Sequence, residues 1–409
     1  MTKKPKLLVI THVLPFPLSA GQNLRVHYSL LAAKEDFDIT ILTFAKSENV
    51  DDVRRKLQTY CNIAIVLKSA YNVNNKIDKV INKISAKIYS DLTGLKESNY
   101  YISKKEFTLN RIKSALKGEH FDLVLFEYWH AWHLASYFKE QGSRTICDTN
   151  NILWQTYKVQ YDKNYPSFIK KYHFNNYKSI EEKVWSKFDA IIAINREEES
   201  YIIRNVNVNT KVFHIAMGID ISKWKYQDKK NAELAIAYYG GLGTKHNVES
   251  AKMIFSDVLP SLRADYPNLK YYIIGSNPPD SLIKLTESDK NAIVTGFVAD
   301  LNETFHNTMI VLIPWVGTYG FRSRIIEVMA SGTLVICSKD AISGMELEVD
   351  KGLKIASTPV EFINKTLQVL KEGEASIQGK FAREQVENKF TFENTYVKGF
   401  KEIQKWIVK

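Results

Sequence analysis

The chain has 409 residues, of which 45% are apolar and 12% are aromatic, so it is long enough for two or three domains with substantial cores. Its formal net charge is +11, but no nucleic-acid recognition motif accompanies the basic residues, so we expect no nucleic-acid partner. The three cysteines, Cys61, Cys147 and Cys337, are too scattered for a disulfide framework or a metal knuckle, which suits a reducing cytosol.

The beginning of the chain predicts neither export nor membrane insertion. The residues MTKKPK precede LLVITH, an apolar run that is too short for a signal peptide. No stretch approaches the roughly eighteen apolar residues of a membrane-spanning helix. We therefore expect a cytoplasmic protein, and its positive charge favours peripheral contact with an anionic membrane on the inner face.

The first half of the chain predicts a Rossmann-like alternation of strands and helices. Residues 7–12 are an apolar strand, residues 23–34 a helix and residues 38–44 a second strand. The loop between the first strand and the helix lacks G-x-G-x-x-G, so it predicts no dinucleotide site. This loop is therefore either a surface turn or a ligand-binding loop.

Two stretches of this half combine basic residues with apolar or aromatic ones. Residues 71–117 contain ten Lys/Arg against four Asp/Glu and predict a basic amphipathic helix. We expect its apolar stripe to pack on the core, with attachment to anionic lipid as the alternative. Residues 157–185 mix aromatics with lysines, a combination typical of a membrane interface or a glycan-binding wall. The apolar stripe consists of Ile77, Val80, Ile81, Ile84 and Ile88.

Polar side chains follow two predicted strands, at residues 121–133 and 143–151. Open α/β sheets bind ligands at the carboxyl ends of their strands. Asp and Asn also cap turns routinely, so each end alone is ambiguous. Two such ends together favour a ligand site. The polar residues are Glu127, His130, His133, Asp148, Asn150 and Asn151.

A strand at residues 189–195 and a helix to residue 205 complete this half. The polar run at residues 226–233 is the predicted interdomain hinge. A second Rossmann-like series follows, with a glycine-rich turn at residues 240–243 and a helix from about residue 247. Glycines let the backbone approach a phosphate, and Lys245 adds a positive charge.

Residues 310–338 predict one βαβ unit: a strand at 310–314, a turn with Gly317 and Gly320, a helix at 321–330 and a strand at 334–337. The turn opens onto a helix N-terminus, where free N–H groups and the helix dipole favour an anion. Arg322 opposes that dipole on the apolar side, which indicates a bound anion. The alternative is a solvated arginine beside a surface ion pair between Arg324 and Glu327.

The same helix has the spacing Gly-x-Arg-x-Arg-x-x-Glu-x-Met-Ala-x-Gly. Its members are Gly320, Arg322, Arg324, Glu327, Met329, Ala330 and Gly332. This spacing resembles the donor-site segment of retaining GT-B glycosyltransferases of family four (glycosyl transferases group 1). The resemblance implies that Glu327 binds the ribose hydroxyls of a sugar nucleotide. Tyr319 stands where the family has a glutamate that contacts the donor sugar.

The resemblance implies an α/β GT-B fold, in which two Rossmann-like domains face each other across a cleft and a C-terminal helix crosses back to the first. The predicted parts are an acceptor domain at residues 1–215, a nucleotide-sugar domain at 216–388 and the returning helix at 389–409. The donor site it implies consists of Gly241, Lys245, Val298, Tyr319, Gly320, Phe321, Arg322, Arg324 and Glu327. The acceptor site consists of Gly21, Gln22, Asn23, Asp148 and Asn151, although Asn150 and Leu153 replace a histidine and a glutamate of the family pattern.

These residues predict transfer of a sugar from a nucleotide diphosphate sugar, with retention, to a glycan or lipid-linked acceptor in cell-surface polysaccharide or glycoconjugate synthesis. Lys245, the two arginines and the N–H groups of the turn would stabilise the leaving diphosphate, so we expect no metal and no cofactor. Glu127 and His130 are the candidates at the reacting centre. The alternatives are a sugar-nucleotide epimerase and a non-catalytic binding protein, which Tyr319 favours.

Overall fold

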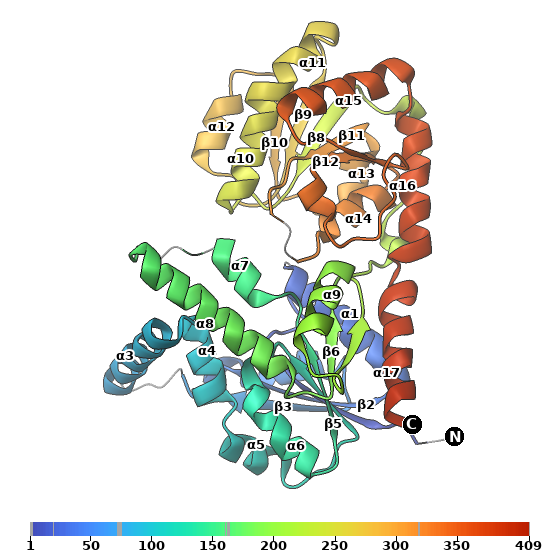
Figure 1. Cartoon of the computed structure of the whole chain (residues 1–409). Helices are drawn as coiled ribbons and strands as arrows, with labels where there is room; N and C mark the ends of the chain where they lie inside the picture. The colour runs from blue at the N-terminus through green and yellow to red at the C-terminus, as the bar shows by residue number, and fades with distance from the viewer. Residues whose placement is uncertain are drawn as a thin grey trace. The chain divides into compact units, whose positions relative to one another are not determined.

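The structure, a computed structural model, describes residues 3–18, 20–71, 76–159, 161, 164–317 and 320–408. The chain divides into two compact units (Figure 1). The N-terminal unit comprises Met1–Ala216 and Tyr396–Lys409, and the C-terminal unit comprises Met217–Thr395.

The predicted hinge at residues 226–233 is wrong, because this segment packs inside the C-terminal unit. The Lys229 ammonium is buried and donates a hydrogen bond to the carbonyl oxygen of Phe305. The Ser376 hydroxyl donates to the Asp228 carboxylate over 2.7 Å. A polar composition indicated a linker, but these distant partners fix the segment.

The N-terminal unit is built on a parallel sheet with the strand order β3-β2-β1-β4-β5-β6-β7 (Figure 1). Most of its central strands are buried along their length, as Val-, Ile- and Leu-rich runs predict for a parallel sheet covered by helices on both faces. The strands are β1 (Lys6–Ile10), β2 (Asp38–Ala45), β3 (Ile63–Lys68), β4 (Leu123–Glu127), β5 (Arg144–Asp148), β6 (Ala190–Ala193) and β7 (Lys211–His214).

The helices of this unit connect successive strands. Short 3-10 and π-helical turns, including Trp129–Leu134 and Ile102–Glu106, extend some of them. The helices are α1 (Gly21–Asp36), α2 (Val50–Leu57), α3 (Lys76–Thr93), α4 (Glu97–Tyr101), α5 (Leu109–Leu116), α6 (Ala135–Glu140), α7 (Leu153–Val159), α8 (Ser167–Trp185), α9 (Arg196–Asn205) and α17 (Lys398–Val408).

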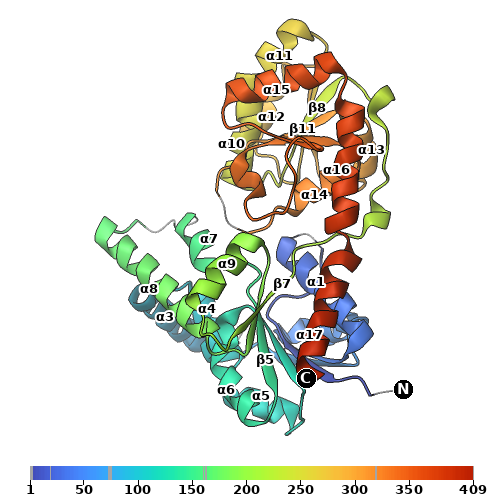
Figure 2. The same ribbon diagram turned by 45° about the vertical axis from the view of Figure 1, so that its right-hand side comes forward.

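The terminal helix α17 packs alongside α1, so the predicted return of the chain end to the first domain is confirmed (Figure 2). The Trp406 ring lies 5.6 Å from the Phe213 ring and under the guanidinium of Arg144. Gly399 allows a close approach here, because a Cβ at this position would lie 2.5 Å from a side-chain carbon of Ile215 and would force that side chain to move. The apolar stripe of the C-terminal residues therefore completes the core of the N-terminal unit.

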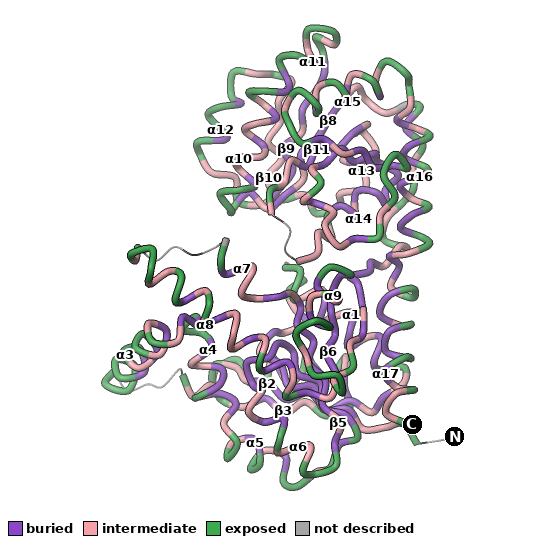
Figure 3. The backbone as a smooth tube through the Cα atoms, viewed as in Figure 1, coloured by how far each residue is buried: buried purple, intermediate pink, exposed green. Residues whose placement is uncertain are grey.

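The C-terminal unit has a second parallel sheet, with the strand order β10-β9-β8-β11-β12-β13. In both units the backbone is buried mainly along the strands (Figure 3). The strands are β8 (Ala235–Tyr239), β9 (Lys270–Ile274), β10 (Ala292–Gly296), β11 (Ile310–Ile313), β12 (Leu334–Cys337) and β13 (Leu353–Ile355).

Local sequence signals set the helix ends of this unit. In α15 (Pro359–Glu372), the Thr358 hydroxyl accepts from the first turn, proline occupies the first turn, and Gly373 ends the helix with a φ of 67°. The other helices are α10 (Lys245–Met253), α11 (Leu259–Asp265), α12 (Asp280–Thr286), α13 (Leu301–His306), α14 (Ser323–Ala330) and α16 (Ala375–Lys389). No helix among the described residues has the length and apolar character needed to cross a membrane.

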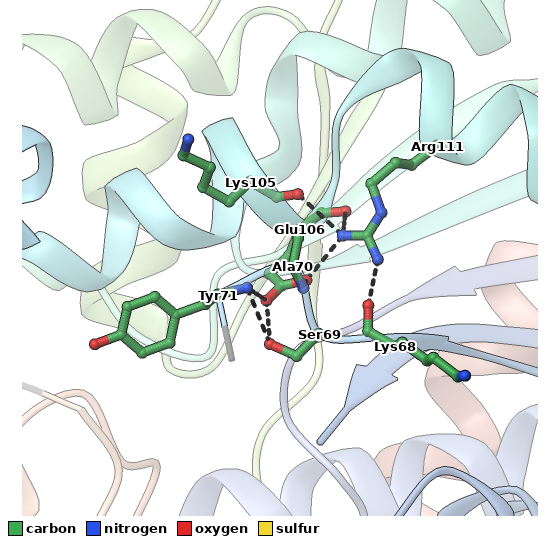
Figure 4. Close-up of polar contacts among 7 residues, drawn as sticks. All are labelled: Lys68, Ser69, Ala70, Tyr71, Lys105, Glu106 and Arg111. Carbon is green, nitrogen blue, oxygen red and sulfur yellow. Dashed lines mark hydrogen bonds and ion pairs between the residues drawn. The ribbon is translucent and has the colours of Figure 1, made fainter. Parts of the chain in front are cut away.

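A buried carboxylate ties the end of β3 to the residues that precede α5 (Figure 4). Glu106 accepts hydrogen bonds from the Ser69 hydroxyl and from the backbone N–H groups of Ala70 and Tyr71. Arg111 donates to the same carboxylate over 2.9 Å and also to the carbonyl oxygen of Lys68. This network fixes the point from which the chain leaves the sheet toward α3.

We expect Glu106→Ala to lower the free energy of unfolding by about 3–5 kcal/mol, because it leaves the Arg111 charge and several buried donors unpaired. Urea unfolding followed by circular dichroism measures the loss. The control is Asp51→Ala, which removes an exposed ion pair with Arg54 and should cost at most about 1 kcal/mol. Equal losses in the two variants would contradict the structural role of Glu106.

Candidate functional site

Each sheet reverses its strand order beside its first strand, between β1 and β4 in one unit and between β8 and β11 in the other. At such a reversal the loops leave the carboxyl ends in opposite directions, which opens a crevice where α/β proteins bind ligands. In the N-terminal unit this edge carries His12, Tyr128 and His130. The His12 ring lies 5.4 Å from Tyr128 and 5.2 Å from His130.

Glu127 ends β4 and is buried. Its pKa is raised to about 8, first by burial and then by the nearby carboxylate of Asp148. The Asn150 amide donates to one of its oxygens over 2.9 Å, and the other oxygen, Oε1, has no hydrogen-bond partner among the described residues. Glu127 is therefore a carboxyl group that changes charge near neutral pH.

His130 lies in the 3-10 turn after β4 and is also buried. Burial lowers its pKa well below the ordinary value and lowers the pKa of His12 to about 4, so both rings are neutral at pH 7. The Nδ1 atom of His130 has no partner within the described part of the chain. The ring also lines a cavity of about 230 Å³, together with Trp129 and Trp132.

The backbone is strained where β4 and β5 end. Tyr128 has a φ of 63° and a ψ of 160°, and Asn150 has a φ of 55°. Conformations of this kind cost on the order of 1–3 kcal/mol each for residues other than glycine and cluster at ligand sites. The strain places the Tyr128 ring parallel to the His130 ring, at 5.7 Å and 11°.

Asp148 ends β5 in a buried ion pair with Arg25 of α1. The Arg25 Nε atom lies 3.0 and 2.9 Å from the two carboxylate oxygens, and both side chains are at most 2% exposed. Arg25 Nη1 also donates to the carbonyl oxygen of Ile215 over 3.0 Å. Asp148 was expected to bind an acceptor; in the structure its carboxylate is buried and pairs with Arg25, which ties β5 to α1. Sequence reasoning missed Arg25, whose only signal is a charge within an apolar helix face.

The other expected acceptor residues lie at the start of α1 and after β5. Gly21 and Gln22 are exposed, and Gln22 accepts a hydrogen bond from the Tyr128 hydroxyl over 3.2 Å. Asn23 donates to the carbonyl oxygen of Leu14, and Asn151 donates to the Thr156 hydroxyl. Gln22 thus contacts the group around Glu127 and His130, whereas the two asparagines stabilise their own loops.

In the C-terminal unit, the two glycine-bearing turns follow β8 and β11, the strands that flank the reversal. The first turn is held to the sheet by a bond from Leu242 N–H to the carbonyl oxygen of Ser276. A Cβ at Gly241 would lie 3.3 Å from Nη2 of Arg324, so the arginine lies against this backbone. The structure therefore brings Gly241 and Arg324 together, as the donor-site prediction requires.

Glu327 is half-buried on α14 and accepts a hydrogen bond from the Tyr239 hydroxyl over 2.9 Å. Burial raises its pKa, although the Tyr239 hydroxyl and Arg324 act in the opposite direction. The Arg324 guanidinium lies 5.4 Å from the centre of the Tyr239 ring. The alternative of a simple surface ion pair between Arg324 and Glu327 is thus wrong, because Tyr239, at the end of β8, contacts both side chains. No sequence signal distinguished Tyr239 from a core residue.

Arg322 precedes α14, which begins at Ser323 instead of Phe321 as predicted. Its guanidinium stacks 4.4 Å from the centre of the Trp315 ring and donates to the carbonyl oxygen of Gly317 over 3.0 Å. The inference that only an anion explains its position is therefore wrong, since protein groups hold it. It is nevertheless a cation fixed beside a helix N-terminus.

The remaining donor-site predictions are placed as follows. Gly320 has a φ of 71°, which a side chain would disfavour, and the Phe321 ring packs 5.9 Å from Phe390. Lys245 begins α10, is 86% exposed and lies 3.6 Å from Glu249, so it is on the surface of its helix. Val298 is half-buried in the loop after β10. Tyr319 lies outside the described residues.

No group of three or more His, Cys, Asp or Glu side chains that could hold a metal ion occurs within the described residues. Asp36 ends α1 and Asp38 begins β2, so these two carboxylates belong to the boundary between a helix and a strand. The described side chains that converge at the carboxyl edge of the second sheet are instead cations and hydrogen-bond acceptors.

Residues 233–372, about a third of the chain, match the family described as glycosyl transferases group 1. The matched segment lies within the C-terminal unit. The matched segment includes the turn at Gly241 and the helix with Arg324 and Glu327. A comparison with curated protein sequences found no match.

Solved structures share the fold over the entire chain, which is GT-B. Sucrose-phosphate synthase (tll1590) from Thermosynechococcus elongatus aligns with a TM-score of 0.70 at 14% identity, covering 99% of this chain and 100% of its own. The pneumococcal O-GlcNAc transferase GtfA, solved in complex with UDP and GlcNAc, has a TM-score of 0.64 at 11% identity, covering 99% of each chain. Anabaena Alr3699/HepE, in complex with UDP and glucose, has a TM-score of 0.61 at 13% identity and covers 99% of this chain and 100% of its own.

The raised pKa of Glu127 predicts a pH-dependent stability. An exposed glutamate has a pKa of 4.5 and the folded value is about 8, so the folded chain retains a proton between these values that the unfolded chain releases. Stability therefore falls as pH rises through this window. Glu127→Gln stays neutral, and we expect it to have a higher melting temperature than the wild type at pH 8 but a similar one at pH 5.

Thermal unfolding at both pH values checks this expectation. Glu181, whose pKa is also raised to about 8 by burial, remains in the variant, so only part of the pH dependence should disappear. Exposed Glu48→Gln is the control. A difference between Glu127→Gln and the wild type that is the same at pH 5 and pH 8 would refute the shifted pKa.

Proposed function

We propose that the protein is a glycosyltransferase that takes a sugar from a nucleotide diphosphate sugar. The observation that supports this most directly is the group at the carboxyl edge of the second sheet: Arg324 against the Gly241 backbone and Glu327 held by Tyr239. This group lies within the segment that matches the glycosyl transferases group 1 family. The GT-B fold is consistent with the proposal but does not specify the reaction.

In this proposal the diphosphate binds between the two glycine-bearing turns. Arg322 and Arg324 supply positive charge, and the N-terminus of α14 supplies N–H groups and the positive end of its dipole. The leaving diphosphate gains negative charge as the glycosidic bond breaks, so fixed cations lower the barrier. The Arg322 guanidinium is already oriented by Trp315 and Gly317, so little reorganisation is needed.

Glu327 would bind the ribose of the nucleotide. Its carboxylate accepts from Tyr239 through Oε2, which leaves lone pairs on both oxygens for two adjacent hydroxyl groups. Lys245 is exposed and would approach the phosphates only through a change of rotamer away from Glu249. Val298 remains the proposed contact to the base.

The acceptor is proposed to bind to the N-terminal unit, as a glycan or a lipid-linked glycan. Glu127 and His130 are the proposed contacts at the reacting centre, because both are buried and each has a polar atom without a partner in the described chain. Neutral His130 offers an acceptor nitrogen to a hydroxyl group. Retention of the anomeric configuration is proposed from the family resemblance, as is a role in polysaccharide or glycoconjugate synthesis.

Calorimetry of donor binding tests the site. A thermal-shift panel of UDP-, GDP- and ADP-sugars first identifies the donor, because a bound ligand raises the melting temperature. We then expect Arg322→Ala and Glu327→Ala each to weaken binding by about 1.5–3 kcal/mol, the value of a charge-assisted hydrogen bond. Arg55→Ala, which removes an arginine from the surface of α2, is the control. Unchanged binding in both site variants would show that the site is elsewhere.

The proposed stabilisation by arginines instead of a divalent cation predicts that turnover resists chelation. We expect full activity in EDTA and no gain from added Mg²⁺ or Mn²⁺, measured as release of nucleotide diphosphate. Activity that is lost in EDTA and restored by either ion would overturn the proposal of a metal-independent reaction. Activity of both Glu127→Gln and His130→Ala at the wild-type level would remove these residues from the reacting centre.

A further inference from the structure

The helix α3 packs on the N-terminal unit with its small and polar side chains. Asn82, Ala86 and Ser90, spaced four residues apart on one face, are buried. The Ser90 hydroxyl donates to the carbonyl oxygen of Leu95 over 2.6 Å, and the Tyr101 hydroxyl donates to the carbonyl oxygen of Asn82 over 3.4 Å. This face holds the helix to its neighbours through hydrogen bonds and close packing.

The opposite face of α3 is apolar and exposed, so the expectation that this stripe packs on the core is wrong (Figure 3). At about 100° per residue, its side chains lie within about 60° of a single line along the helix. Each is between 54% and 68% exposed. The members are Ile77, Val80, Ile81, Ile84, Ile88 and Leu92.

The stripe continues onto the first turns of α8, which lies beside α3 in Figures 1 and 2. The Tyr172 hydroxyl donates to the carbonyl oxygen of Leu92 over 2.9 Å, and the Tyr165 hydroxyl donates to Asp91. The side chains of Phe168 and Tyr172 are 73% and 55% exposed. We call the apolar stripe of α3 together with Phe168 and Tyr172 the α3–α8 surface.

The other aromatic residues of the 157–185 region do not belong to this surface. Tyr157 and Tyr177 are buried in the core of the N-terminal unit, and Phe174 packs against it. These three rings are therefore unavailable to the membrane interface or glycan-binding wall that the sequence suggested for this region. Core packing accounts for most of these rings, and it leaves Phe168 and Tyr172 at the surface.

The charge beside the stripe is positive. Three exposed lysines lie along one flank of α3, about 80–120° from the centre of the stripe, and Lys79 lies further round the helix. The helix also contains two aspartates, one of which already accepts from Tyr165. The long side chains of the flank lysines can keep the ammonium groups at the level of lipid phosphates while the neighbouring apolar groups enter the acyl region. The flank lysines are Lys76, Lys83 and Lys87.

We propose that the α3–α8 surface docks on the face of an anionic lipid bilayer, with α3 lying in the plane of the interface. The six exposed aliphatic side chains would insert into the bilayer, and the lysines on the flank would attract the negative headgroups. A second copy of the chain fits less well, because a second α3–α8 surface offers the lysine flank no excess of negative charge. The proposal goes beyond sugar transfer and does not depend on the donor site.

Co-sedimentation of the full chain with lipid vesicles tests the proposal. The probes are vesicles of phosphatidylglycerol with phosphatidylcholine, compared with vesicles of phosphatidylcholine alone. We expect binding to the anionic vesicles that weakens with added salt. Ile84→Ser with Ile88→Ser should weaken it about tenfold or more. Lys83→Gln and Lys87→Gln should weaken it about fivefold each, which corresponds to about 1 kcal/mol per lysine.

Matched controls use exposed residues outside the α3–α8 surface. Val360→Ser with Ile377→Ser and Lys398→Gln with Lys401→Gln should bind vesicles like the wild type. The serine variants should keep the wild-type melting temperature, because the replaced side chains are already exposed.

Three results would overturn the proposal. The first is no binding to anionic vesicles, and the second is equal binding by the wild type and the Ile84→Ser, Ile88→Ser variant. The third is a dimer in light scattering that this variant dissociates, which would make the surface an interface between copies. Donor binding, measured separately by calorimetry, distinguishes a failure here from a failure of the proposed function.

Discussion

The reversal of strand order beside β1 and beside β8 is the constraint on which the functional geometry of each unit depends. Parallel strands place all their carboxyl ends at one edge, and the reversal separates the loops at a single point of that edge. In the C-terminal unit, β8 and β11 therefore deliver two glycine-bearing turns to the same place. Arg324, Glu327 and Tyr239 meet there, although they come from a helix and a strand that are far apart in the chain.

The corresponding edge of the N-terminal unit concentrates buried polar groups. One guanidinium, Arg25, faces two carboxyl groups, Asp148 and Glu127, and it pairs directly with Asp148. Since a second buried negative charge has no partner of equal strength, Glu127 retains its proton to higher pH. The strained backbone at Tyr128 and Asn150 belongs to the same cluster. Such an arrangement lowers the stability of the fold but holds its polar atoms in defined positions, as is common at binding sites.

The helix α3 shows that an apolar helix face need not be the face that packs on the protein core. A periodic apolar stripe predicts only that one face avoids water, and in most globular helices the protein core covers it. Here small and polar residues make the contact with the protein, and the aliphatic face remains exposed. The network around Glu106 fixes residues 69–71, which directly follow β3. The exposed face is therefore a property of a defined structure and calls for a partner with an apolar surface.

The sequence by itself determined the features that depend on neighbouring residues. The apolar runs predicted as strands at 310–314 and 334–337 became β11 and β12, and the helix predicted around Glu327 became α14. Only the tertiary structure decided which polar groups meet, because their partners are remote: Tyr239 lies 88 residues before Glu327, and Arg25 lies 123 residues before Asp148. It also decided which face of α3 is covered. Periodicity records the pattern along one segment, whereas burial depends on contacts between segments that the pattern does not contain.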